Sequence, residues 1–161
     1  RWWAGFPNGV KWSFLPGNLW PHYVVANADE SEPGTFKDRE ILENNPYQFL
    51  EGLMIAAYAV GAQEAYVYLR GEFEAIHRQL NACIARLEEA HLLGDQLFGT
   101  DVRLRIYTHL GAGAYICGEE TALLESLEAG RAEAEGLGEA VPFNFAGITW
   151  RLGKSGFLKW R

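Results

Sequence analysis

The alternation of short β-branched segments with segments of helical period is the feature that most constrains the fold. Strand-like sequences occur at residues 23–26, 65–69 and 102–107. Apolar residues at helical spacing follow the first strand at 46–61 and the second at 73–87. Such alternation requires crossover connections and a parallel sheet covered by helices. The sequence therefore predicts an α/β fold, a Rossmann-like three-layer parallel sheet with helices on both faces.

Proline, glycine and threonine mark the expected ends of the first helices. Thr35 is expected to cap a short helix from Phe36 to Asn44. Pro46 suits the first turn of the next helix, because its fixed φ matches a helix and its missing N–H would be unpaired there. That helix is expected to end at Gly61.

The rest of the chain divides into a long amphipathic helix, a glycine turn and a weakly patterned end. The helical period that begins at Glu72 is expected to end near Gly94. The turn at 111–115 leads into a further helix that Gly130 ends. Residues 131–140 are acidic and rich in small residues, which is typical of a loop.

Composition and charge exclude several classes of protein. The chain has 161 residues, 48% hydrophobic and 22% charged, which is ordinary usage for one folded domain. Its formal net charge of −7 disfavours nucleic-acid binding, because contacts to phosphates dominate that affinity. No apolar run reaches the roughly 18 residues of a membrane span, so no direct membrane insertion is expected. The chain opens on Arg1 without a signal-peptide pattern, and a cytoplasmic protein is expected.

Cysteine and histidine spacing predicts no metal site. Two cysteines are too few for a Cys₄ zinc or iron–sulfur site, and their number fits a reducing compartment. Cys83 is expected in the core, and packing is also favoured for Cys117 over a reactive thiol. The four histidines show no ligand spacing: His22, His77, His91 and His109. We assign neither a metal ligand nor a catalytic residue.

Polar residues cluster where the first strand ends, and ligands of open parallel sheets bind outside the carboxyl ends of the strands. Asn27 is followed there by Asp29, Glu30 and Glu32. Carboxylates so placed can accept hydrogen bonds from a ribose or from the edge of a flavin ring. A solvated acidic loop is the alternative, since runs of acidic residues mostly lie on exposed faces.

A second cluster begins at the glycine turn and enters the last helix. Glycines let a phosphate approach the backbone, and a helix N-terminus favours an anion. Ile116 occupies the third glycine position of G-x-G-x-x-G, so the dinucleotide fingerprint fails. Glu119 and Glu120 suit hydroxyl donors of a ligand, and they equally suit the helix dipole. Both interpretations stay open.

Near the N-terminus, aromatic side chains accompany a cation. Phe6, Lys11 and Phe14 lie on a segment broken by glycine, and exposed aromatics beside a cation suit a nucleotide base and its phosphate. A plug in the core is the alternative for these aromatics, and we favour it for Trp12.

Four segments occur in the order and spacing of one known family: AGFPNGVKWSF at 4–14, NADESEPGTFKDR at 27–39, YLRGE at 68–72 and GAGAYICGEETAL at 111–123. They resemble the flavin-carrying, NADH-oxidising subunit of respiratory complex I. The same family includes diaphorase subunits of NAD-reducing hydrogenases and of NAD-dependent formate dehydrogenases. The resemblance implies an FMN- and NADH-binding domain over 1–130, followed by a loop and divergent tail over 131–161.

The resemblance also implies FMN as the cofactor and NAD(H) as the substrate. The cofactor-binding residues that it implies are Asn27, Asp29, Glu30, Ser31, Tyr115, Gly118 and Glu119. Those implied to contact NADH are Phe6, Lys11, Phe14, Glu32 and Glu120. Hydride transfer needs no protein nucleophile, only the nicotinamide held against the flavin. The implied partners are other subunits of the peripheral arm of complex I, or of a related dehydrogenase, at the cytoplasmic or matrix face of the inner membrane.

The chain departs from the family at both ends. Trp2 and Trp3 stand where the family has glycines close to the flavin, and indoles occupy space that glycine leaves open. The Val-Asn-Asn segment that finishes the flavin site is missing, as are the cysteine ligands of the family's [4Fe–4S] cluster. We therefore expect a truncated relative that binds FMN weakly or not at all. A diaphorase subunit and a non-catalytic remnant without flavin are the two alternatives.

Overall fold

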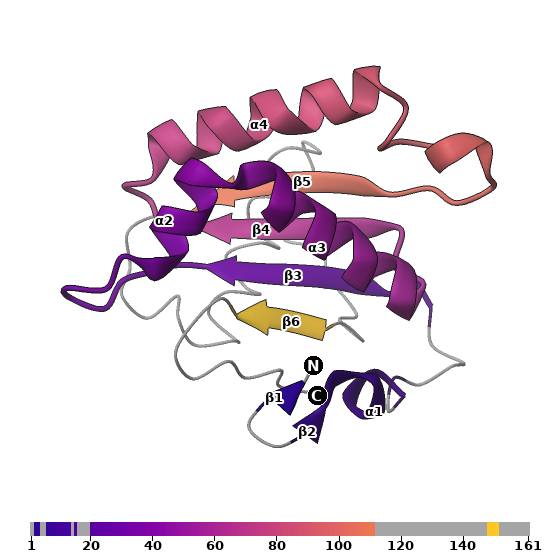
Figure 1. Ribbon diagram of the computed structural model, residues 1–161, viewed down its shortest axis with the longest axis horizontal. Coiled ribbons are helices and arrows are strands. Elements are labelled where there is room, and N and C mark those ends of the chain that lie inside the picture. The colour runs from indigo at the N-terminus through magenta and orange to yellow at the C-terminus, as the bar shows by residue number, and fades with distance from the viewer. Residues whose placement is uncertain (1, 4–5, 14, 16–19, 112–147, 152–161) are drawn as a thin grey trace, which may run out of the picture.

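The computed structural model describes the backbone of residues 2–3, 6–13, 15, 20–111 and 148–151. A parallel sheet forms its centre, with strand order β5-β4-β3-β6 (Figure 1). The strands are β3 (Tyr23–Ala28), β4 (Glu64–Leu69), β5 (Arg105–Leu110) and β6 (Ile148–Arg151). The predicted α/β class with a parallel sheet is confirmed.

Three helices pack on one face of this sheet. They are α2 (Lys37–Asn44), α3 (Pro46–Val60) and α4 (Glu74–Glu89). Figure 1 shows α2 and α3 in front of the strands and α4 along the β5 side. The helix expected between the glycine turn and Gly130 lies outside the described residues.

Short elements near the N-terminus complete the described part of the chain. Strands β1 (Trp2–Trp3) and β2 (Phe6–Pro7) pair antiparallel, and α1 (Asn8–Trp12) follows them directly. A 3₁₀ turn, η1 (Leu97–Gly99), connects α4 to β5. No helix in the described ranges is long and apolar enough to cross a membrane.

The hydrophobic core lies between the sheet and these three helices. Side chains alternate along a strand, so Val24, Ala26 and Ala28 of β3 face α3 and are fully buried. Cys83 of α4 joins this core, and Trp12 packs against it, as the sequence predicts for both. Val25 and Asn27 are also buried, and alternation places them on the opposite face. Burial on both faces explains why β3 is an almost continuous apolar run.

The ends of α3 follow from its sequence. Pro46 begins the helix, and Gly61 follows its last residue with φ 69°. The amides of Gly61 and Ala62 bond the carbonyl oxygens of Tyr58 and Ala57, which satisfies groups that a helix end leaves unpaired. Both predicted ends are therefore confirmed.

The other helix boundaries differ from expectation. Helix α2 begins at Lys37, and its cap position is Phe36 rather than Thr35. The side chain of Phe36 makes no capping hydrogen bond. The end of α4 comes at Glu89 rather than near Gly94, because His91 adopts φ 56° and turns the chain. The Leu92 amide then bonds the Leu87 carbonyl, which closes a Schellman-type end without glycine.

Strand boundaries also differ. Strand β3 continues two residues beyond the expected end, to Ala28. Strand β5 begins at Arg105 instead of Val102, because Leu104 first forms an isolated antiparallel bridge with Gly94. Strand β6 lies within the stretch expected to be a loop and tail, although Ile148, Thr149 and Trp150 are residue types that favour strands.

Alanine substitutions at Gly52, inside α3, and at Gly61, which follows its last residue, should change the free energy of unfolding in opposite directions. In Gly61→Ala the new Cβ would lie 2.9 Å from Trp20 Cη2 at a positive φ, so we expect a loss of about 1–2 kcal/mol in the free energy of unfolding. Gly52→Ala meets nothing within 4 Å and should gain about 0.5–1 kcal/mol through helix propensity. Urea unfolding of both variants measures this, and changes of the same sign would contradict the described helix end.

Candidate functional site

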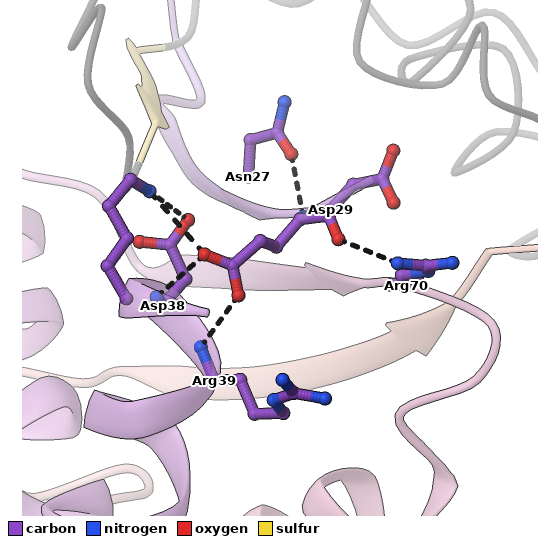
Figure 2. A network of polar contacts seen from close by, with 7 residues as sticks. Asn27, Asp29, Asp38, Arg39 and Arg70 are labelled. Atoms are coloured by element: carbon purple, nitrogen blue, oxygen red, sulfur yellow. Dashed lines mark hydrogen bonds and ion pairs between the residues drawn. The ribbon is translucent and has the colours of Figure 1, made fainter. Parts of the chain in front are cut away.

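The site is built on the loop that follows β3. Asn27 lies near the end of the strand with 3% of its surface exposed. Its side-chain Oδ1 accepts a hydrogen bond from the Asp29 amide at 3.0 Å (Figure 2). Asparagine commonly makes such a local turn, which stands in for a backbone turn. The bond fixes the direction in which the acidic loop leaves the sheet.

The two carboxylate oxygens of Asp29 differ in whether they accept a hydrogen bond from the described residues. Oδ1 accepts the Ser31 hydroxyl at 2.8 Å. Oδ2 is buried and has no hydrogen-bond partner within the part of the chain that the structure describes. A buried acceptor without a donor is costly, and such atoms usually find a partner in the working molecule. Asp29 Oδ2 is therefore the strongest indication of a ligand at this loop.

Glu30 uses its carboxylate inside the protein. It is 4% exposed, and its Oε1 and Oε2 accept the amides of Asp38 at 3.0 Å and Arg39 at 3.1 Å. These amides belong to the first turn of α2, whose N–H groups have no partner within the helix. The negative charge also suits the positive end of the helix dipole. Glu30 thus caps α2, which is the role expected of Thr35, although it lies eight residues before Asp38 in the sequence.

Lys37 balances the acidic side chains at this helix start. Its Nζ lies 2.6 Å from Asp38 Oδ2 and 3.8 Å from Glu30 Oε1. Asp38 is buried with 4% of its surface exposed. The cation therefore compensates two carboxylates that the fold has largely removed from water.

Arg70, directly after β4, joins this loop to the next one. Its Nη1 donates to the backbone carbonyl of Glu30 at 3.0 Å, while Nε and Nη2 donate to the Glu72 carboxylate at 2.7 and 2.9 Å. The hydrogen bond to Glu72, with the charges of Glu72, Asp29 and Glu30, raises the pKa of Arg70. The same hydrogen bond lowers the pKa of Glu72. Sequence reasoning gave Arg70 no role, although a base at a strand's carboxyl end, beside an acidic loop, was an available signal.

Packing against Tyr68 requires a glycine at Gly111, the first residue of the glycine turn. Gly111 donates its amide to the Leu69 carbonyl at 2.8 Å and so extends the pairing of β4 with β5. A Cβ at Gly111 would lie 2.6 Å from the hydroxyl of buried Tyr68. The Tyr68 ring stacks on His109, with ring centres 5.4 Å apart. Burial, with a smaller contribution from the charge of His77, lowers the pKa of His109.

Strand register brings these features to one edge of the sheet. Ala28 pairs with Leu69 and Leu69 with Leu110, so Asp29, Arg70 and Gly111 each follow the last residue of a neighbouring strand. This is the edge at which ligands of open parallel sheets bind. Within the described ranges, no three His, Cys, Asp or Glu residues group so as to hold a metal ion.

The predicted site residues divide into three groups. The structure brings Asn27, Asp29, Glu30 and Ser31 together, and it leaves the Glu32 side chain largely exposed beside them. Phe6 and Lys11 have their backbones in β2 and α1, with side chains outside the described part. The remaining predicted residues lie outside the described residues altogether: Phe14, Tyr115, Gly118, Glu119 and Glu120.

Comparison with known proteins identifies the family to which the chain belongs. The family model of the Nuo51 FMN-binding domain matches residues 3–144, and the chain belongs to this family. An NADH-quinone oxidoreductase subunit of Rhizobium meliloti is 53% identical over 131 residues, which are 81% of this chain and 31% of that protein. The NADH-quinone oxidoreductase subunit of the same type from Aquifex aeolicus is 53% identical over 128 residues, 80% of this chain and 30% of that protein.

A solved structure shows the same fold. A crystal structure of NAD⁺-reducing [NiFe]-hydrogenase in the air-oxidized state matches with a TM-score of 0.64 and 44% identity. The match covers 78% of this chain and 20% of the hydrogenase chain. The chain thus spans about a third or less of each of these three relatives. The predicted resemblance to the NADH-oxidising subunit family is confirmed.

Glu30→Gln should destabilise the protein while Glu88→Gln should not. The amide of glutamine has one acceptor oxygen, so one helix N–H of α2 would lose its partner and face an NH₂ donor. We expect a loss of about 1–3 kcal/mol in the free energy of unfolding. Glu88, which is exposed near the end of α4, provides the control for removing a carboxylate charge. Thermal and urea unfolding measure both variants, and equal midpoints would contradict the capping role.

Proposed function

We propose that the chain supplies the flavin- and nucleotide-binding part of an NADH-oxidising dehydrogenase. The proposed reaction is hydride transfer from NADH to FMN, with electrons passing onward to iron–sulfur centres of the assembly. The observation that supports it most is Asp29 Oδ2, a buried acceptor without a donor among the described residues, at the ligand-binding edge of a parallel sheet. Membership of an FMN-binding domain family supports the choice of ligand.

The residues present suit this cofactor. The edge of a flavin ring offers an N–H donor flanked by carbonyl acceptors, and Asp29 Oδ2 is an acceptor in need of such a donor. We propose that Asn27, Asp29 and Ser31 hold the flavin together with Tyr115, Gly118 and Glu119. The Glu30 carboxylate is occupied by α2, so its proposed part is to position the loop. When bound, FMN accepts a hydride and passes electrons on singly.

The chain's own contribution to the chemistry is binding and orientation. Phe6, Lys11, Phe14, Glu32 and Glu120 are proposed to contact NADH, the aromatics by stacking on the adenine and the charged groups by positioning the rest. Ribose hydroxyls would donate to the carboxylates, and Lys11 would face a phosphate. No side chain needs to act as nucleophile, because holding the two rings in contact is sufficient for hydride transfer.

The proposed setting is a multi-subunit enzyme. The two NADH-quinone oxidoreductase relatives are subunits by name, and identity to them is higher, at 53% each, than to the hydrogenase, at 44%. This favours the peripheral arm of complex I, at the cytoplasmic or matrix face of the inner membrane, over a diaphorase subunit of a hydrogenase or formate dehydrogenase. Identification of co-purifying subunits distinguishes these assemblies.

A second candidate function is nucleotide or partner binding without flavin. It is favoured by Trp2 and Trp3, which replace family glycines and which the structure places in β1, paired with Phe6–Pro7. On this alternative the chain is a non-catalytic remnant.

Replacing both tryptophans tests the two candidates against each other. The unaltered chain should bind FMN weakly but measurably, whereas a remnant would not bind it, and Trp2→Gly/Trp3→Gly should bind FMN at least several-fold more tightly, because glycine restores the open space. Quenching of flavin fluorescence measures both affinities. Stoichiometric FMN on the unaltered chain would show that the indoles do not obstruct the site. No binding by the double variant would favour the remnant.

Glutamine substitutions at the proposed NADH contacts test the nucleotide part. Glu32→Gln and Glu120→Gln should each weaken NADH binding several-fold or more, because a charge-assisted hydrogen bond contributes about 1.5–3 kcal/mol. Fluorescence titration with NADH measures this. Glu88→Gln is the control, since Glu88 is exposed on α4. Unchanged affinity at Glu32 and Glu120, or an equal change at Glu88, would contradict the assignment.

A further inference from the structure

Arg70 holds a fixed place between two loops that are far apart in the sequence. One nitrogen donates to the Glu30 carbonyl, which is 40 residues away, and the other two donate to the Glu72 carboxylate, two residues away. A planar guanidinium can satisfy three such acceptors at once, whereas an ammonium cannot reproduce this arrangement. Glu72 takes two parallel hydrogen bonds and thereby orients the third nitrogen toward Glu30.

The residue that this arrangement fixes is Asp29. On one side, Asn27 accepts the Asp29 amide. On the other, Glu30 is held twice, by its carboxylate on the amides of α2 and by its carbonyl on Arg70. Asp29 lies between these anchors, and its Oδ2 is the buried acceptor without a donor in the described part of the chain. The direction in which Oδ2 points therefore depends on where Arg70 holds the Glu30 carbonyl.

Exposure argues against a mainly stabilising role for the Arg70–Glu72 pair. The two side chains are 35% and 61% exposed, and ion pairs so exposed contribute little to stability. What the pair does accomplish is geometric, because it links the carboxyl ends of β3 and β4 at the edge where the ligand is proposed to bind.

We propose that Arg70 is a positioning residue for the flavin-binding loop, acting through the Glu30 carbonyl to set the orientation of Asp29, with Glu72 orienting the guanidinium. This proposal rests on the proposed function for its choice of ligand. The restraint of residues 29–31 by Arg70 does not depend on which ligand binds.

The experiment compares Arg70→Gln, Arg70→Lys and the control Arg105→Lys. Arg105 is a suitable control, because its Nη2 also contacts both oxygens of a carboxylate, those of Asp95, in an exposed pair away from the loop. Amide hydrogen exchange at Asp29 and Ser31 is measured by NMR on the full chain without ligand. FMN affinity is measured by flavin fluorescence in the Trp2→Gly/Trp3→Gly background.

Arg70→Gln should speed exchange at Asp29 and Ser31 about tenfold and weaken FMN binding at least fivefold. Arg70→Lys should give a smaller change in both. In both Arg70 variants, the amide exchange rates in α4 and the unfolding midpoint should equal those of the parent chain. If Arg70 served only to stabilise the fold, its substitution would change these two quantities as well. Arg105→Lys should alter none of these quantities. If Arg70→Gln fails to fold, Arg70→Lys decides the outcome by the same measurements.

Two results would overturn the proposal. One is unchanged exchange at Asp29 and Ser31 in both Arg70 variants, and the other is an equal change in Arg105→Lys. Absence of FMN binding by the Trp2→Gly/Trp3→Gly background itself would contradict the proposed function instead. The exchange measurements would then still decide whether Arg70 restrains the loop. Faster exchange with unchanged FMN affinity would overturn the link between Arg70 and the ligand.

Discussion

The carboxylate of Glu30 lies inside the protein at the first turn of α2, where it accepts the amides of Asp38 and Arg39. An acidic loop left to itself would extend into water, because its charges repel one another and are well solvated there. Here the unpaired N–H groups of a helix start draw one carboxylate inward, and Lys37 lies close enough to compensate it. With Glu30 anchored, the loop is tied to the first turn of α2. Asp29 then reaches a position where one of its oxygens is buried.

The parallel sheet gives this loop its neighbours. Because β3, β4 and β5 end in register, the residues that follow them meet at one edge, although they are separated by about 40 positions in the sequence. Arg70 contributes a cation from the second strand, and Gly111 contributes a position without a side chain from the third. The close approach of the Tyr68 hydroxyl to Gly111 shows that this glycine is needed for packing, whatever the turn binds.

Local chemistry made much of the fold predictable. The β-branched run of β3, the proline at the start of α3 and the glycine at its end act within a few residues, and all three were predicted. The failures involve partners distant in sequence or an uncommon backbone state. Glu30 caps α2 from outside the helix, and His91 ends α4 in a conformation usually left to glycine. Strand β6 is too short for its strand-favouring residues to be decisive, and its pairing partner β3 lies far away in the sequence.

For the site residues too, local sequence was predictive and contacts between distant segments were not. Asn27, Asp29, Glu30 and Ser31 were predicted from the family resemblance, because their position after a strand left a solvated loop open as the alternative, and the structure brings them together. Their separate tasks could not be predicted, since whether a carboxylate faces a helix or a ligand depends on tertiary packing. Arg70 was missed for the same reason: the YLRGE segment marks it and Glu72 as a family motif, but its contact with the Glu30 carbonyl depends on tertiary packing.

Asp29 Oδ2 is proposed to accept a hydrogen bond from a bound flavin. The most direct measurement is the ¹³C resonance of the Asp29 carboxyl in chain labelled at aspartate side chains, assigned with Asp29→Asn and followed as FMN is added to the Trp2→Gly/Trp3→Gly variant. We predict that the Asp29 resonance shifts in proportion to FMN bound, while that of Asp95, exposed and distant from the loop, does not. Saturation with FMN and no shift at Asp29, or an equal shift at Asp95, would contradict the claim.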